Sequence, residues 1–151
     1  MRIFFDSSAL CKYFIEEEGT PEVRQLMADA SGKRGVFLSV SAVTYAEVMA
    51  TLRRARHENR ILESDFLSVV EDFRQRWKRL HVAGVTPATI ERSGMLGLSH
   101  TLKGCDAFQL ACALDIGADL LVSSDDDLNN AAVRTGMTVW NPVTDAVPQL
   151  F

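Results

Sequence analysis

Four acidic side chains stand beside apolar segments in this chain. Asp6 and Asp125 each follow an apolar, strand-like run, while Glu47 and Asp106 lie within apolar helical segments. If the fold gathers these carboxylates, their mutual repulsion is large, and a bound cation is what makes such a cluster tolerable. Carboxylate oxygens are ligands that Mg²⁺ accepts, and ions of this kind promote phosphodiester cleavage. The acids therefore indicate a magnesium-dependent phosphodiester-cleaving site.

Each acid taken alone also has a structural explanation. An aspartate that caps a helix N-terminus contributes about 1 kcal/mol, which applies to Asp6 and Asp125. Asp126 and Asp127 would add favourable charge to the first turn of the following helix. Glu47 is harder to explain in this way, because its segment is apolar enough to be largely buried and a buried glutamate needs a partner. All four acids together favour a shared site.

Several other kinds of site are excluded by spacing. A phosphatase of the haloacid-dehalogenase type needs a second aspartate where Ser8 stands. The run 125–129 has the spacing of a calcium loop, but Asn130 replaces the required glycine and Gly136 replaces the bidentate acid. The chain has no GxGxxG or GxxxxGK[ST] motif, and its three histidines show neither metal spacing nor a catalytic serine motif.

Length and composition are typical of one soluble globular domain over residues 1–151. The hydrophobic share is 47% and the charged share 24%, and no apolar run approaches the roughly 20 residues that cross a bilayer. The N-terminal segment is too short and too soon acidic for a signal peptide. Three cysteines, an odd number without a CxxC pair, indicate buried thiols in a reducing cytoplasm.

The net charge of −4 is unusual for a protein that binds nucleic acid, so the placement of charge matters more than its sum. Basic residues gather at 53–56 and at 74–79, where a solvated helix face is the simpler explanation. Arg54 lies two helical turns beyond Glu47 and so on the same face. We take Arg54, together with Lys103, as a candidate contact for substrate phosphates.

Helices and strands are expected to alternate along the chain. Short apolar strands separated by helices imply a parallel sheet covered on both faces, with function at the carboxyl ends of its strands. Thr20 and Ser41 are expected to cap the second and third helices. The strands are predicted at about 2–5, 36–39, 80–83, 120–123 and 138–140, and the helices at about 7–15, from 20, 41–59, 63–79, 86–100, 105–116 and 125–135.

Four motifs occur in an order that resembles the PIN-domain ribonucleases, and most closely the VapC-type toxins of toxin–antitoxin pairs. The motifs are Ile3-Phe4-Phe5-Asp6-Ser7-Ser8-Ala9-Leu10, Tyr45-Ala46-Glu47, Cys105-Asp106-Ala107-Phe108-Gln109-Leu110-Ala111 and Leu121-Val122-Ser123-Ser124-Asp125.

The resemblance implies a three-layer α/β/α sandwich around a parallel sheet. It implies a site that binds one or two Mg²⁺ or Mn²⁺ ions through Asp6, Glu47, Asp106 and Asp125, with hydrogen bonds from Ser8 and Ser123 in support. The motif favours Asp125 over Asp126 and Asp127 as the fourth acid.

The activity expected from this resemblance is cleavage of single-stranded or looped RNA by a metal-activated water, because an exposed backbone can reach a recessed site. The alternatives are an RNA-processing or DNA-acting nuclease without an antitoxin, a catalytically silent interaction module, and a metal-dependent phosphatase.

Partners follow from the same resemblance. We expect a small antitoxin in an exposed apolar groove, an arginine of the antitoxin at the acids, and a homodimer formed through another surface. The apolar residues expected to contribute to this groove lie on the early helices and the fourth helix: Leu10, Tyr13, Phe14, Val23, Leu26, Met27, Phe66, Val70, Phe73 and Trp77.

Overall fold

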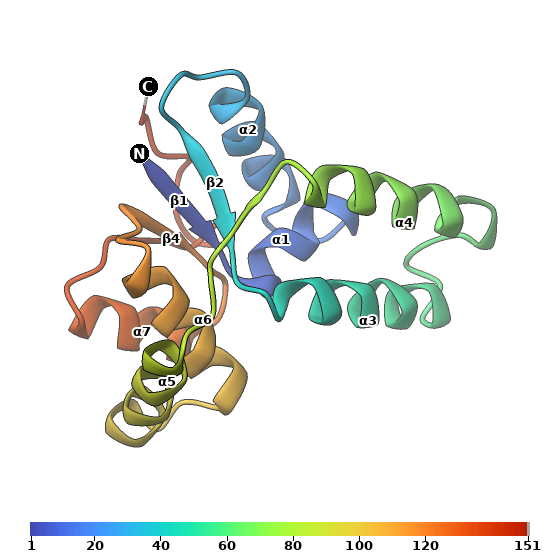
Figure 1. The fold of residues 1–151 in the computed structure, drawn as a ribbon. Coiled ribbons are helices and arrows are strands. Elements are labelled where there is room, and N and C mark those ends of the chain that lie inside the picture. Colours follow the sequence, from blue (N-terminus) through green and yellow to red (C-terminus); the bar gives the residue numbers. More distant parts are fainter. Residues whose placement is uncertain (151) are drawn as a thin grey trace.

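Five short strands form a central sheet in the computed structural model, which describes residues 1–150 (Figure 1). All neighbouring strands are parallel, and their order is β3-β2-β1-β4-β5. The predicted parallel sheet is therefore confirmed. The strands are β1 (Arg2–Phe5), β2 (Phe37–Val40), β3 (His81–Val82), β4 (Leu120–Val122) and β5 (Val139–Trp140).

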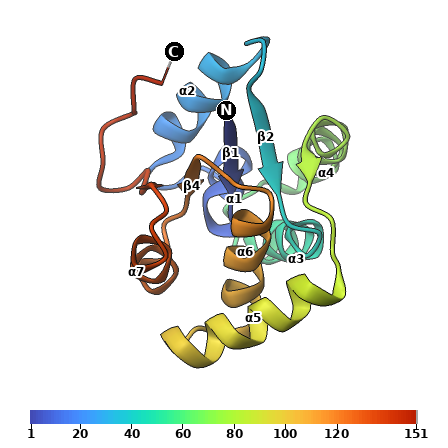
Figure 2. The ribbon, with the colours of Figure 1, turned by 60° about the vertical axis from the view of Figure 1, so that its left-hand side comes forward.

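Helices cover both faces of this sheet. Helices α1 and α2 lie on one face and α6 and α7 on the other, with α5 packed on the outside of α6 (Figures 1 and 2). This is the predicted three-layer α/β/α sandwich. The helices are α1 (Ser7–Phe14), α2 (Thr20–Ala30), α3 (Thr44–His57), α4 (Glu63–Trp77), α5 (Pro87–His100), α6 (Gly104–Asp115) and α7 (Asp126–Arg134).

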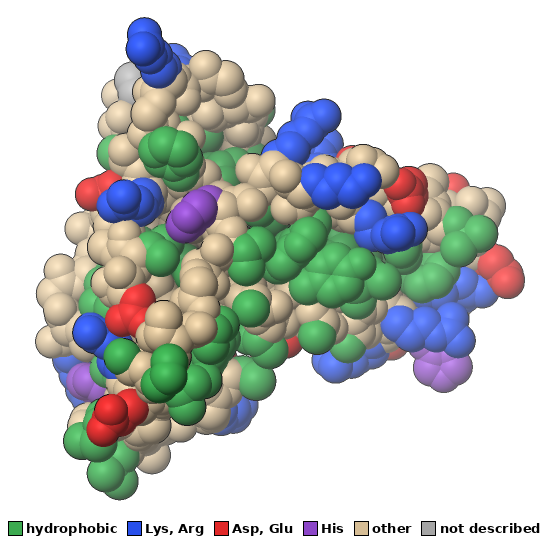
Figure 3. Space-filling model, in the orientation of Figure 1, with side chains coloured by type: hydrophobic (Ala, Val, Ile, Leu, Met, Phe, Trp, Pro, Cys, Tyr) green, Lys and Arg blue, Asp and Glu red, His purple; other side chains and the backbone are tan. Residues whose placement is uncertain are grey.

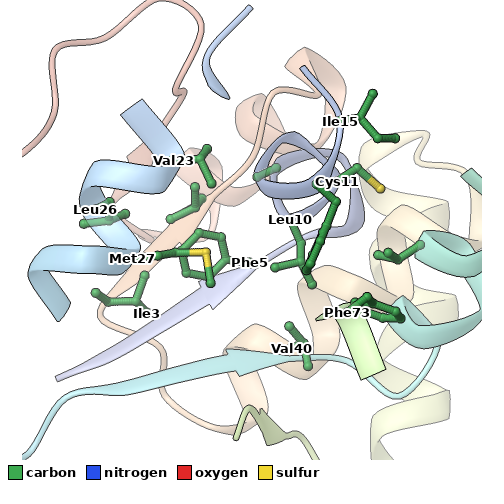
Figure 4. Close-up of a cluster of buried hydrophobic side chains, with 14 of the residues drawn as sticks. Ile3, Phe5, Leu10, Cys11, Ile15, Val23, Leu26, Met27, Val40 and Phe73 are labelled. Atoms are coloured by element: carbon green, nitrogen blue, oxygen red, sulfur yellow. The ribbon is translucent and has the colours of Figure 1, made fainter. Parts of the chain in front are cut away.

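Alternation along the strands divides the buried side chains into two cores. Ile3 and Phe5 of β1 point to the core beneath α1 and α2, while Phe4 points to the core beneath α6 and α7. Leu10 of α1 and Leu26 of α2 lie in the same core as Phe5 (Figure 4). The central strands β1 and β4 are buried on both faces, so they read as continuous apolar runs in the sequence.

Helices α3 and α4 run side by side as a hairpin that projects from the sheet (Figure 1). Phe73 of α4 is fully buried and anchors this hairpin, with its ring 5.4 Å from Phe14 and 5.4 Å from Tyr45. The exposed groove was expected to draw on some of ten large apolar residues of the early helices and α4, and most of the ten are core residues instead. Six of the ten belong to the first core: Leu10, Phe14, Val23, Leu26, Met27 and Phe73.

Two helix starts differ from their predictions. Gly19, not Thr20, caps α2, with a positive φ of 88° and so little space that an added Cβ would lie 3.0 Å from the carbonyl oxygen of Pro142. Helix α3 begins at Thr44 rather than after Ser41, because the chain first makes a turn there. No helix among residues 1–150 is long and apolar enough to cross a membrane.

Candidate active site

The topology brings the four predicted acids to one edge of the sheet. Asp6 follows β1 and Asp125 follows β4, which are neighbouring strands, and the Asp6 amide donates a 3.1 Å hydrogen bond to the Val122 carbonyl. Helices α3 and α6 carry Glu47 and Asp106 in their first turns. The strands are parallel, so their carboxyl ends share one edge, which is where open α/β sheets bind their ligands.

Asp6 is a buried carboxylate at the N-terminus of α1. Its Oδ1 accepts hydrogen bonds from the Ala9 amide and the Ser8 hydroxyl, both at 2.9 Å. Burial raises the pKa of Asp6 to about 6, although hydrogen bonds from Ala9, Ser8 and Ser123 oppose that shift. No lysine or arginine forms an ion pair with it within residues 1–150, so its charge lacks a cationic partner.

Serine hydroxyls connect Asp6 with the segment after β4. Ser8 Oγ accepts from the Ser124 amide at 3.1 Å, and Ser123 Oγ accepts from the Asp125 amide at 3.0 Å. Both predicted supporting serines therefore lie beside the acids. Asp125 also caps α7, because its Oδ1 accepts from the Leu128 amide at 2.9 Å.

Asp106 lies near enough to the other acids for their charges to affect its protonation. Burial raises the pKa of Asp106 most, and the negative charge of Asp125 raises it next. Lys103 opposes this shift, while Glu47 and Asp127 add to it. Asp125 thus acts more strongly on Asp106 than Asp127 does, and Lys103 lies close to the acids.

Glu47 is held by two side chains that sequence reasoning missed. Its Oε2 accepts from the Ser7 hydroxyl and, at 2.8 Å, from Gln109 Nε2. The same Nε2 donates to Ser7 Oγ at 2.7 Å, and Gln109 Oε1 accepts from Thr44 at 3.3 Å. The sequence does contain a signal for Gln109, because it is a polar residue in the apolar run of α6, one turn after Asp106.

The burial expected around Glu47 is only partly found. Thr44 and Val48 are buried, but Ala46 is exposed and Glu47 itself is half-buried. Its need for partners is met by the hydrogen bonds of Ser7 and Gln109 rather than by a cation.

The donor types suit a hard divalent cation, although the described side chains do not form a closed ligand shell. Within residues 1–150, no three His, Cys, Asp or Glu side chains are arranged to hold a metal ion. Glu47 and Asp125 each use an oxygen in hydrogen bonds within the protein. The uncompensated charge of Asp6 and the raised pKa of Asp106 are nevertheless what a cation would relieve.

A cavity of about 360 Å³ opens beside Glu47, and Arg54 lines it. The predicted shared face of Glu47 and Arg54 is thereby confirmed. In the other basic run, Arg74 pairs with Glu71 and Arg76 with Asp72 within α4. Arg74 fits the expected solvated helix face, whereas Arg76 is half-buried against Tyr13.

A second concavity of about 380 Å³ lies away from the acids, between α2, β2 and the end of α4. Tyr13 and Met27 of the predicted groove residues line it, next to Leu38 and Leu80. Arg76 stacks over the Tyr13 ring at 4.2 Å from its centroid. The concavity thus combines apolar walls with cationic side chains.

Comparison with known proteins identifies relatives over most of the chain. The family model of the PIN domain matches residues 3–134. Ribonuclease VapC45 of Mycobacterium tuberculosis is 28% identical over 139 residues, which cover 91% of this chain and 93% of that protein.

Solved structures share the fold at low sequence identity. M. tuberculosis VapC20, described as a sarcin-ricin loop cleaving toxin, has a TM-score of 0.65 and 18% identity, over 85% of this chain and 94% of that one. A toxin–antitoxin complex from Klebsiella pneumoniae gives a TM-score of 0.63 and 20% identity, over 93% and 97% of the two chains.

Proposed function

This chain belongs to the PIN domain family, and we propose from that membership that it is an endoribonuclease toxin whose activity depends on Mg²⁺ or Mn²⁺. The observation that carries the proposal is the meeting of Asp6, Glu47, Asp106 and Asp125 at one sheet edge, where burial raises the pKa of Asp106 and the neighbouring negative charges raise it further. The ribonuclease name of the relative VapC45 supports RNA as the substrate. The three free cysteines support action in a reducing cytoplasm.

The four acids are proposed to hold the metal, which supplies Lewis acidity for hydrolysis of a phosphodiester when bound. Ser8 and Ser123 orient the Asp6 and Asp125 segments through their hydrogen bonds. Lys103 and Arg54 offset the repulsion between the acids and the phosphates of single-stranded or looped RNA.

Two neighbouring substitutions on one helix test this proposal. We expect Asp125→Asn to abolish Mn²⁺-dependent cleavage of single-stranded RNA, while Asp127→Asn keeps most of it. Asparagine caps helices as well as aspartate does, so the start of α7 is preserved. The measurement is the cleavage rate of a labelled RNA with Mn²⁺ and with EDTA. Wild-type activity in both variants would refute the metal site. Loss of activity only in Asp127→Asn would identify Asp127 as the fourth ligand.

The partner proposed for the second concavity is a small antitoxin. Its apolar lining and arginines suit a short, amphipathic segment of a partner chain. The structural neighbour from K. pneumoniae, itself a toxin–antitoxin complex, supports this type of partner. We propose that an arginine from another part of the antitoxin pairs with the acids, since a guanidinium binds carboxylates in a bidentate manner.

Co-expression with the small reading frame beside this gene tests the antitoxin. We expect the two proteins to co-purify and growth inhibition by this chain to be relieved. Tyr13→Glu, which places an acid among the apolar lining, should weaken co-purification while leaving RNA cleavage intact. An active ribonuclease that neither inhibits growth nor binds the neighbouring product would be an RNA-processing enzyme instead.

The surface proposed for a homodimer is the outer face of α5. Ile90, Met95 and Leu98 are 53%, 57% and 79% exposed on this helix, and Figure 3 shows apolar side chains gathered over it. Burying such a face against a second copy removes apolar area from water. Light scattering should show a dimer that Leu98→Glu converts to a monomer; a monomeric wild-type protein would contradict the proposal.

A further inference from the structure

The cavity beside Glu47 extends away from the acids between α1 and α3. Ala50, Thr51 and Arg54 are spaced three to four residues apart, so they form one face of α3 that continues from Glu47. The opposite wall comes from α1, and the near end reaches the segment after β4. The complete lining consists of Ser7, Ser8, Cys11, Glu17, Glu47, Ala50, Thr51, Arg54 and Ser124.

The two charged residues at the far end of this cavity differ in their partners. Glu17 is compensated, because Lys12 Nζ lies 3.0 Å from one of its carboxylate oxygens and Arg60 Nη1 lies 3.4 Å from the other. Arg54 is exposed and makes neither an ion pair nor a hydrogen bond with any side chain of residues 1–150. An unpaired guanidinium therefore faces a cavity whose other end is formed by Glu47, Ser8 and Ser124.

The remaining lining is mixed in character. Ala50 and Cys11 present apolar surface, while Ser7 and Thr51 present hydroxyls. A volume of about 360 Å³ lies in the range of small-molecule sites, roughly 300–1,000 Å³. The apolar surface suits a flat base, the hydroxyl groups suit a ribose, and the guanidinium of Arg54 suits a phosphate. The lining therefore matches the parts of a nucleotide.

We propose that this cavity is a nucleotide subsite, which holds the ribose and base on one side of the scissile phosphate while Arg54 pairs with the next phosphate. The inference rests on the proposed ribonuclease function and adds to it the path of the RNA, from the acids along α3. Arg54 thereby counteracts the repulsion that Glu47 and Asp106 exert on the polyanion.

RNA binding without cleavage tests the subsite. The probe is a fluorescein-labelled, mixed-sequence, single-stranded RNA of seven nucleotides, titrated by anisotropy in EDTA. We expect Arg54→Ala to weaken binding about tenfold, the loss typical of one charge-assisted hydrogen bond to phosphate. Arg53→Ala is the matched control, because it removes the same charge from the adjacent exposed position, which does not line the cavity. It should weaken binding about twofold or less.

A steric variant separates the cavity from the charge. Ala50→Leu keeps a strong helix former at an exposed position and fills the cavity with an apolar side chain. We expect a weakening of about tenfold, similar to that of Arg54→Ala. Melting temperatures within a few degrees of wild type establish that both variants fold.

The outcomes distinguish this inference from the function on which it rests. Equal losses in Arg53→Ala and Arg54→Ala, or undiminished binding by Ala50→Leu, would overturn the subsite. If wild type cleaves RNA with Mn²⁺ and Arg54→Ala retains the wild-type KM, the ribonuclease stands and the subsite falls. If binding depends on Arg54 and Ala50 but no RNA is cleaved, the subsite stands and the ribonuclease function falls.

Discussion

At the scale of single residues, Asp6 fits both a structural role as a helix cap and a functional role as a metal ligand. It caps α1 through the Ala9 amide, and it is also a buried carboxylate that has no cationic partner among residues 1–150. The cap needs only one oxygen as an acceptor, so the charge itself is not required for the helix. The cost of that buried charge is what a bound cation would remove.

The pH dependence of stability should reveal this cost in the metal-free protein. The pKa of Asp6 is about 6, above the roughly 3.9 of an unfolded aspartate, so the folded state binds more protons between these values. The destabilisation is therefore complete above pH 6 and disappears as pH falls toward 4. Asp6→Asn should stabilise the protein at pH 8 by on the order of 3 kcal/mol, and by little near pH 4.

Urea denaturation of both proteins in EDTA at pH 4, 6 and 8 measures this difference. If Asp6→Asn were less stable than wild type at pH 8, the Asp6 carboxylate would not destabilise the fold. A difference in the free energy of unfolding that did not change with pH would contradict the prediction in the same way.

Gln109 is the second residue whose role can be isolated. Gln109→Glu places a new carboxylate against Glu47 in a buried position, where two negative charges repel in a low dielectric. We expect a loss of stability of about 2 kcal/mol or more at pH 8, which becomes smaller toward pH 5 as the new acid protonates.

A matched control exists on α4. Gln75 also donates to a glutamate, Glu71, at 2.5 Å, but on the exposed surface. Gln75→Glu should cost only about 0.5 kcal/mol in the same denaturation experiment, because water screens like charges on a helix face. Similar losses of stability in the two variants would mean that burial around Glu47 does not increase the repulsion between the two carboxylates.

At the scale of elements, the α3–α4 hairpin depends on one aromatic anchor. Phe73 is fully buried and its ring meets those of Phe14, Tyr45 and Trp77 at centroid distances of 5.4, 5.4 and 6.0 Å. Such contacts add to the free energy of burying the ring itself. The same packing fixes α3 against α1 and so holds Glu47 and Arg54 in place.

Phe73→Ala should therefore destabilise the protein by about 3–5 kcal/mol, the usual loss for removing a buried phenylalanine. Leu67→Ala on the same helix is the comparison, since Leu67 is 77% exposed and its loss should change stability by less than about 0.5 kcal/mol. Urea denaturation at one pH compares both variants with wild type. A small effect at Phe73 would show that the hairpin is held by other contacts.

At the scale of the whole molecule, a ligand that binds only the folded chain raises its stability by mass action. If the acids hold Mg²⁺ or Mn²⁺, an ion at 100 times its Kd adds about 2.7 kcal/mol, which corresponds to roughly 5–10 °C in a domain of this size. Differential scanning fluorimetry with millimolar metal against EDTA measures the shift.

Glu47→Ala should reduce this shift, whereas Glu91→Ala, which removes an exposed glutamate of α5, should leave it unchanged. An unchanged melting temperature of wild type in millimolar Mn²⁺ would contradict the metal site.

The sequence determined the elements and their order almost completely. Apolar periodicity is a local property, so the short strands and the amphipathic helices were placed within a few residues. Parallel pairing followed from the alternation of strands and helices, and it put Asp6 and Asp125 at one sheet edge. The capping residues of α2 and α3 were missed. Gly19 lies against the distant Pro142, which no local pattern indicates, and a turn closed by the Thr44 amide and the Ser41 carbonyl delays the start of α3.

Only the tertiary structure decided how the site residues are held. The bonds from Ser7 and Gln109 to Glu47 join residues 40 and 62 positions apart, and no local pattern specifies such a contact. Burial of Asp6, and with it the raised pKa, arises from helices packed around the end of β1. Periodicity marks which face of a helix is apolar, but packing determines whether that face lies in the core or on an open groove.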